Sequence, residues 1–222
     1  RRSSDLALCE QGRNFNNKIW NCFRLVKGWT VADIPQPQYA QLATRWFESQ
    51  LNKAAAEMED LFSKYRISEA LMVIYKLFWD EFSAWYLEMI KPQYGSPIDS
   101  TTYKQTLSYF DSLLRLLHPF MPFITEELWQ DIEEHAEGES IMFQPVSVIG
   151  KDADEQLTRD FETIKEVISS VRSIRLQKGI APKEALVLEV VGRNKFPAYD
   201  AVVSKMANIS SINVVIDRKS VV

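Results

Sequence analysis

Apolar residues recur at helical spacing along most of the chain. In residues 12–29 they form one face of a helix, made by Phe15, Ile19, Cys22, Phe23 and Val26. The same periodicity predicts helices over residues 38–65, 67–91, 99–117 and 152–178. In the last of these, the side chains expected to face inward are Phe161, Ile164, Val167, Ile168, Val171 and Ile174.

Two helices are predicted to meet at a proline-rich corner. The pair His118-Pro119 ends the first helix, because a residue before proline disfavours the α region. Pro122 suits the first turn of the next helix, and Glu126 and Glu127 are expected near the positive end of its dipole. Residues 136–150 then read as a loop with a short strand at residues 141–143.

The pattern changes after Gly179, which suits the C-terminal cap of the preceding helix. Residues 185–191 and 212–216 are apolar and β-branched, which predicts strands, and residues 198–206 between them read as a helix. The chain is therefore predicted to be mainly α. We expect a helical bundle over residues 1–180 and a small C-terminal α/β appendage over residues 181–222.

Composition excludes several protein classes. Apolar residues make up 46% of the 222 residues and charged residues 25%, as in an ordinary globular protein with a sizeable core. No apolar run approaches the ~20 residues that span a bilayer, and no signal peptide opens the chain, so no membrane partner is expected. Two cysteines are too few for a disulfide scaffold, and with only two histidines the sequence argues against a metal site. So few cysteines are typical of a protein of the reducing cytoplasm. The chain starts without Met and ends just after an apolar run, so we expect a fragment.

The net charge of −4 by itself disfavours binding to nucleic acid, but the charges are unevenly distributed. Residues 11–32 hold four basic side chains and no acid. In residues 165–183 basic side chains outnumber the single acid, Glu166. These two segments leave room for local contact with RNA.

Residues 12–21 (Gly-Arg-Asn-Phe-Asn-Asn-Lys-Ile-Trp-Asn) carry the strongest local motif. Four asparagines within eight residues are unfavourable in a helix interior, so helix propensity does not explain them. Asn amides can pair with base edges, and Arg and Lys can meet phosphates. The alternative is a solvated polar face with some Asn bonded to neighbouring loops.

Three other motifs have a structural alternative that is as good or better. His118 has no catalytic partner at a suitable spacing, and the aromatic stripe of residues 78–86 has the spacing of core packing. Arg172 and Arg175 lie three residues apart beside an apolar face. They could follow a phosphate backbone or form a solvated edge of the bundle.

Together these motifs resemble the anticodon-binding domain of valyl-tRNA synthetases, which are class I aminoacyl-tRNA synthetases. The resemblance rests on residues 12–21 with the following Phe23-Arg24-Leu25-Val26, on residues 118–129 (His-Pro-Phe-Met-Pro-Phe-Ile-Thr-Glu-Glu-Leu-Trp), and on residues 172–182. It covers about residues 8–216. The His-Pro corner is shared with the isoleucine and leucine enzymes, whereas the Asn-rich segment is more specific to the valine enzyme.

The resemblance implies a tRNA-binding fragment of a valine–tRNA ligase. The parent enzyme would join valine to tRNA(Val) with ATP and Mg²⁺, while this fragment would need no cofactor and be inactive alone. Neither HIGH nor KMSKS occurs here, the nearest match being Lys205-Met206-Ala207-Asn208, and the editing domain has no counterpart. The implied partners are tRNA(Val) and the rest of the synthetase in the same polypeptide, in a monomeric cytoplasmic enzyme.

Valine anticodons share A and C at their second and third positions, so the resemblance implies readout of that pair. The side chains expected to contact the anticodon are Arg13, Asn14, Asn17, Lys18, Asn21 and Arg24. Arg172 and Arg175 are weaker phosphate candidates, and no catalytic residue is expected in this fragment. Two alternatives stay open: a helical protein-interaction or scaffold module, and the same domain of an isoleucyl-tRNA synthetase.

Overall fold

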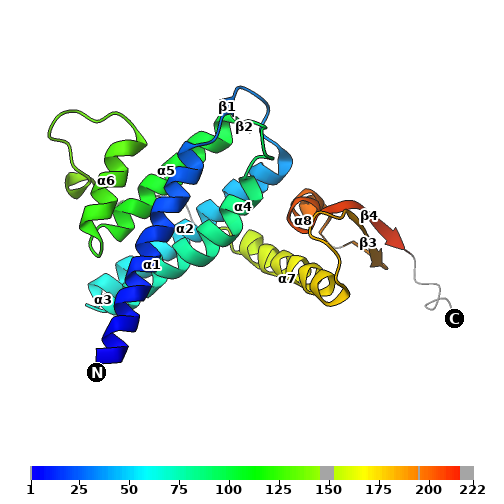
Figure 1. The fold of residues 1–222 in the computed structure, drawn as a ribbon, viewed down its shortest axis with the longest axis horizontal. Helices are drawn as coiled ribbons and strands as arrows, with labels where there is room; N and C mark the ends of the chain where they lie inside the picture. Colours follow the sequence, from blue (N-terminus) through cyan, green and yellow to red (C-terminus); the bar gives the residue numbers. More distant parts are fainter. Residues whose placement is uncertain (1, 146–152, 195, 216–222) are drawn as a thin grey trace.

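A helical bundle fills the first two thirds of the molecule, and a long helix leads from it to a small α/β unit (Figure 1). The computed structural model describes residues 2–145, 153–194 and 196–215. In the bundle the elements are α1 (Arg2–Lys27), α2 (Gln38–Ser63), α3 (Ile67–Lys76), the π-helical segment η1 (Leu77–Tyr86), α4 (Leu87–Ile90), α5 (Ser100–Leu117) and α6 (Pro122–Ile132). The predicted bundle of helices is confirmed, and α1 begins ten residues earlier than the periodicity alone indicated, at Arg2 rather than residue 12.

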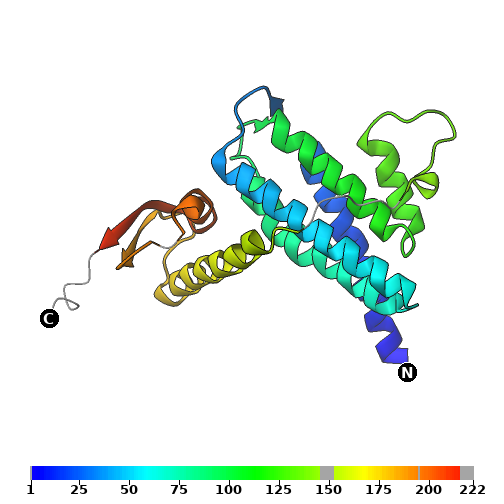
Figure 2. The same ribbon diagram turned by 180° about the vertical axis from the view of Figure 1, so that it is seen from behind.

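The core lies between α1, α2, η1 and α5. α2 and α5 run side by side on the face away from α1 (Figure 2). Phe78, Phe82 and Tyr86 of η1 are fully buried, and the Phe82 ring centroid lies 5.5 Å from that of Phe110 on α5. The aromatic stripe of residues 78–86 is therefore mainly core packing, as its helical spacing predicted.

Local capping chemistry fixes the start of α5. The Asp99 side chain accepts a hydrogen bond from the backbone N–H of Thr102 at 2.7 Å and so caps α5. A two-residue parallel ladder between β1 (Val31–Ala32) and β2 (Ile98–Asp99) ties the loop after α1 to this cap. The end of α1 is thereby fixed beside the start of α5.

The proline corner forms as predicted, with Pro122 in the first turn of α6. The expectation that Glu126 and Glu127 lie at the positive end of the helix dipole is wrong, because both fall beyond the first turn. The predicted strand at residues 141–143 is also wrong. These residues form a 3-10 turn, η2 (Ile141–Phe143), because the Ser140 hydroxyl accepts a hydrogen bond from the Met142 N–H and caps the turn.

After η2 come α7 (Glu155–Lys178), β3 (Leu186–Val191), the 3-10 turn η3 (Pro197–Tyr199), α8 (Asp200–Ala207) and β4 (Ile209–Val215). Gly179 caps α7 with φ of 66°, in the left-handed region where glycine is at ease. β3 and β4 pair in parallel, with Leu188 opposite Ile212, and α8 connects them. The fold is thus mainly α with a small α/β appendage, as predicted.

The expected inward face of α7 is right over its first half and wrong near its end. Phe161, Ile164 and Ile168 are buried, but Ile174 is exposed and its neighbour Arg175 is buried instead. The first half of α7 packs on α2, whereas its last turns leave the bundle and meet the appendage. The buried side of the helix therefore rotates along its length.

Candidate nucleic-acid interface

The asparagine-rich segment forms the exposed side of α1. Phe15, Ile19, Cys22, Phe23 and Val26 are buried on the inner side, as their spacing predicted. The exposed side presents Arg13, Asn14, Asn17, Asn21 and Arg24. At 100° per residue these positions fall on one side of the helix, so their side chains form one stripe about 16 Å long.

Aromatic packing holds α1 firmly against the bundle. The Phe15 ring lies 4.7 Å from the ring of Tyr75, and the Phe23 ring lies 5.5 Å from that of Phe110, both measured between centroids. Cys22 Sγ donates to Ser83 Oγ at 3.4 Å, and burial raises the pKa of this thiol. The outer stripe is therefore displayed on a helix with a fixed orientation.

The side chains of the stripe are free to meet a ligand. Within the described part of the chain, Arg13, Asn14, Asn17, Asn21 and Arg24 make no side-chain hydrogen bond or ion pair, so the alternative of Asn bonded to neighbouring loops has no support there. These exposed amide and guanidinium groups form hydrogen bonds to water. Removing that water costs little free energy only when a ligand supplies hydrogen bonds in its place.

Lys18 and Trp20 flank this stripe. Lys18 is half-buried, with its Nζ 5.4 Å from the centroid of the Trp79 ring, which places the cation at the edge of the stripe. Trp20 is 39% exposed and lies three residues from Asn17 and four from Arg24. A partly exposed indole beside amide and guanidinium groups can stack on an unpaired base. The sequence already placed this tryptophan among the polar positions of the helix, interleaved with Asn17 and Arg24.

The charge near the stripe is mainly positive. Arg13, Lys18 and Arg24 supply three cations, and Lys27 at the end of α1 donates to the Ile132 carbonyl at 3.2 Å. Glu10 is the nearest acid along α1, one turn before the stripe. Along α1 the stripe is therefore positively charged, although the chain as a whole is negative.

Arg172 and Arg175 have other partners. Arg175 is only 6% exposed, and its Nη1 and Nη2 donate to the carbonyls of Ala181, Glu184, Ala207 and Asn208 at 2.7–3.3 Å. This arginine joins the end of α7 to the appendage, so the geometry does not support the phosphate role that the sequence suggested.

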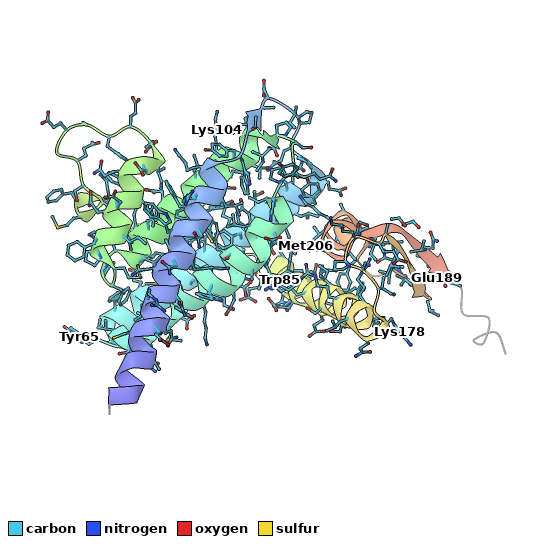
Figure 3. The ribbon with its side chains drawn as sticks, in the orientation of Figure 1. Tyr65, Trp85, Lys104, Lys178, Glu189 and Met206 are labelled. Carbon is cyan, nitrogen blue, oxygen red and sulfur yellow. The ribbon has the colours of Figure 1, made fainter. Side chains whose placement is uncertain are left out.

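Arg172 is more exposed but also engaged. Its Nε and Nη2 donate to the Met206 carbonyl at 3.3 and 3.0 Å, and its guanidinium carbon lies 5.6 Å from the centroid of the Trp85 ring. Figure 3 shows Trp85 beside the start of α7 and Met206 on the appendage. Arg172 therefore bridges bundle and appendage, far along the molecule from the α1 stripe.

The histidines have structural roles. His118 Nδ1 shares a 2.8 Å hydrogen bond with Thr125 Oγ1 across the proline corner, and the His135 ring stacks on Trp129 at 3.6 Å. Residues 2–145, 153–194 and 196–215 contain no group of three or more His, Cys, Asp or Glu side chains that could hold a metal. In the same residues, no helix has both the length and the apolar character that crossing a membrane requires.

A groove of about 620 Å³ lies between α2 and α3, lined partly by Lys53, Glu57, Arg66 and Glu81. Its charges are mixed and it is open to solvent. No pair of side chains in it has a nucleophile and base arrangement, so the α1 stripe is the better candidate for a site.

Comparison with known proteins identifies the family of the chain. A family model described as the anticodon-binding domain of tRNA ligase matches residues 44–191. The chain is 65% identical over 211 residues to a valine–tRNA ligase of Phocaeicola vulgatus, and 62% identical over 216 residues to that of Bacteroides thetaiotaomicron. Each match covers 95% of this chain and 24% of the relative.

A more distant relative gives the same result. The valine–tRNA ligase of Fusobacterium nucleatum is 35% identical over 222 residues, covering 92% of this chain and 25% of the relative. The chain thus spans about a quarter of the length of the curated relatives it matches.

Proposed function

The chain belongs to the anticodon-binding domain family of tRNA ligases, and on that premise we propose that it binds the anticodon loop of valine tRNA as part of a valine–tRNA ligase. The observation that carries the proposal is the exposed stripe of α1, whose amides and guanidiniums have no partner within the described chain. The relatives are named valine–tRNA ligases, which favours valine over isoleucine as the amino acid of the parent enzyme.

Each type of side chain in the stripe has a distinct task in this proposal. Asn14, Asn17 and Asn21 can each donate and accept, so they suit the edges of unpaired bases. Arg13 and Arg24 suit phosphates because a guanidinium donates to two oxygens at once.

Two flanking residues complete the proposed site. Lys18 adds a point charge, and Trp20 offers a ring on which a splayed base can stack. The shared A and C of valine anticodons are the bases that such a stripe would have to distinguish from other bases.

The longer polypeptide would join valine to its tRNA with ATP and Mg²⁺ in the cytoplasm, and would act as a monomer. This chain would hold the anticodon end and contribute no reacting group, because it contains neither HIGH nor KMSKS. Aminoacylation therefore depends on parts of the ligase beyond these 222 residues.

Alanine substitutions on α1 test the proposal. N17A and N21A should each weaken binding of the chain to valine tRNA by about 1–3 kcal/mol if the amide meets a base edge. N52A is a control, since Asn52 is a partly exposed asparagine on α2 and lies outside the stripe. Equal affinities for N52A, N17A and N21A in folded protein would remove the stripe from the site.

The salt dependence of tRNA binding distinguishes contacts with phosphates from contacts with bases. K18M should reduce the slope of log affinity against log salt by about 1, because one phosphate contact is lost. An unchanged slope would place Lys18 outside the phosphate path.

A further inference from the structure

Three large apolar side chains lie exposed at one corner of the bundle, outside the α1 stripe. Phe123 on the first turn of α6 is 90% exposed, and Met142 and Phe143 of η2 are 63% and 74% exposed. Single exposed apolar residues are ordinary on protein surfaces, but a group of them marks a contact surface. We call these three residues the apolar corner.

Polar contacts hold the apolar corner in place. The Glu126 carboxylate accepts hydrogen bonds from Ser140 Oγ at 2.7 Å and from Gln130 Nε2 at 2.8 Å. Gln130 also donates to the Glu139 carbonyl at 2.7 Å. η2 is thus pinned to α6, and Phe123 lies one helical turn before Glu126 on the same side of α6.

Hydrogen bonds of the turn keep the apolar side chains of η2 exposed. A loose loop would let Met142 and Phe143 fold back onto the protein and lose their contact with water. Here the turn is capped at Ser140 and bonded to α6, so both side chains stay outward. Their exposed area together with that of Phe123 amounts to about 400 Å².

The charges of the sequence segment that carries the apolar corner argue against RNA as its partner. From residue 116 to residue 150 the sequence has seven acidic residues and no Lys or Arg. The nearest cation before this segment, Arg115, is paired with Asp111 at 2.9 Å. Phosphates would be repelled from such a surface. A protein surface with an apolar centre and a basic rim would fit it.

The exposed apolar area of the corner indicates whether its partner is a separate protein or another part of the same polypeptide. Stable association of two free proteins takes about 800 Å² from each partner, roughly twice what the apolar corner offers. A segment in the same chain needs far less, because its effective concentration is in the millimolar range. The curated relatives are about four times as long as this chain, so such a segment is available.

We propose that the apolar corner is the place where another part of the longer ligase polypeptide docks on the bundle. The inference rests on the proposed function only in that it takes the chain to be part of a longer ligase. The docked segment supplies an apolar centre and basic side chains at its edge. Docking here fixes the bundle relative to the rest of the enzyme and leaves the α1 stripe free for tRNA.

Thiol labelling tests the proposal without using enzyme activity. F143C is introduced into the 222-residue chain and into the full ligase polypeptide, and labelling by a maleimide is followed by peptide mass spectrometry. Y94C is the control, because Tyr94 is fully exposed on the loop after α4. If the docked form exceeds the undocked form by about tenfold, F143C should react about tenfold more slowly in the full ligase, with Y94C unchanged.

A second variant checks that the slow reaction comes from docking. Adding F123S to F143C in the full ligase should restore fast labelling, because Phe123 belongs to the same contact surface. Circular dichroism verifies the fold, which a substitution at so exposed a position should leave intact. Slow labelling that F123S does not change would contradict the proposal.

Other outcomes also overturn it. Equally fast labelling of F143C in both proteins would mean that nothing covers the apolar corner. Slowing only at high protein concentration would identify a second copy of the chain as the occupant, and slowing on addition of tRNA to the 222-residue chain would identify RNA. The labelling of F143C in the full ligase is measured without tRNA. Its result therefore remains valid even if the substitutions on α1 do not change tRNA binding.

Discussion

Arg175 offers the sharpest test of how the appendage is attached. It is buried at the end of α7, and its guanidinium donates to four backbone carbonyls on two segments of the appendage. R175A removes all four hydrogen bonds at once. The contact to the Ala207 carbonyl is fully buried, whereas the other three carbonyls lie near solvent and can bond to water.

The expected loss follows from these two environments. A buried carbonyl left without a donor costs about 1–3 kcal/mol, and each partly exposed hydrogen bond contributes about 0.5 kcal/mol. The local opening free energy of the appendage should therefore fall by about 3 kcal/mol, allowing for incomplete additivity. That is roughly a hundredfold change in an equilibrium constant.

Amide hydrogen exchange measures this opening directly. In R175A the amides of β3 and β4 should exchange about a hundredfold faster, while those of α2 and α5 keep the wild-type rate. R159A is the matched control on α7, because Arg159 is exposed and bonds only within the same helix. Unchanged exchange in β3 and β4 combined with weaker tRNA binding would refute the structural role and restore Arg175 as a phosphate ligand.

Two further substitutions probe the contacts between α7, α8 and the bundle. Lys165 is buried, with Nζ 2.5 Å from Glu81 Oε2 and 4.8 Å from the centroid of the Trp46 ring, so K165M should lower the free energy of unfolding by about 2 kcal/mol. Urea unfolding followed by tryptophan fluorescence checks this against K53M at an exposed position, and equal midpoints would contradict it. Desolvation by burial lowers the pKa of Lys205 from 10.5 to about 8, against an opposing effect of Glu88. Between those two values the folded chain binds fewer protons than the unfolded chain, so wild type should gain stability relative to K205M as pH rises from about 8 to about 10.5. A constant difference in melting temperature across that range would exclude the shift.

Most of the helices and some of their ends were predictable because they depend on local chemistry. Apolar spacing in residues 12–29 identified the buried face of α1 correctly, and the cap at Gly179 and the first turn at Pro122 followed from backbone preferences. These features need no knowledge of distant contacts. The same holds for the β-α-β order of the appendage.

The errors arise where distant contacts decide. Ile174 and Arg175 exchanged their expected places, because the end of α7 faces the carbonyls of the appendage rather than the apolar core. Periodicity measured along the helix cannot detect that change of neighbour. The apolar run at residues 141–143 resembled a strand, but the Ser140 cap and the contacts of Glu126 made it a turn.

The candidate site was only partly predictable. The composition of residues 12–21 singled out the polar stripe, and the structure places its members on one exposed side of α1. Helical spacing placed Trp20 among the polar positions of α1, but its 39% exposure comes from the structure. Exposure at the boundary of an amphipathic helix depends on what packs beside it.

Binding of this chain to valine tRNA, beside the same tRNA with its second anticodon base changed, tests anticodon recognition most directly. The comparison is made at low salt, where phosphate contacts keep binding measurable. If the α1 stripe reads the anticodon, the changed tRNA should bind more weakly by about 1–3 kcal/mol, and N17A or N21A should reduce that difference. Equal affinity for the two tRNAs would contradict anticodon readout by this chain and leave only a nonspecific electrostatic contact.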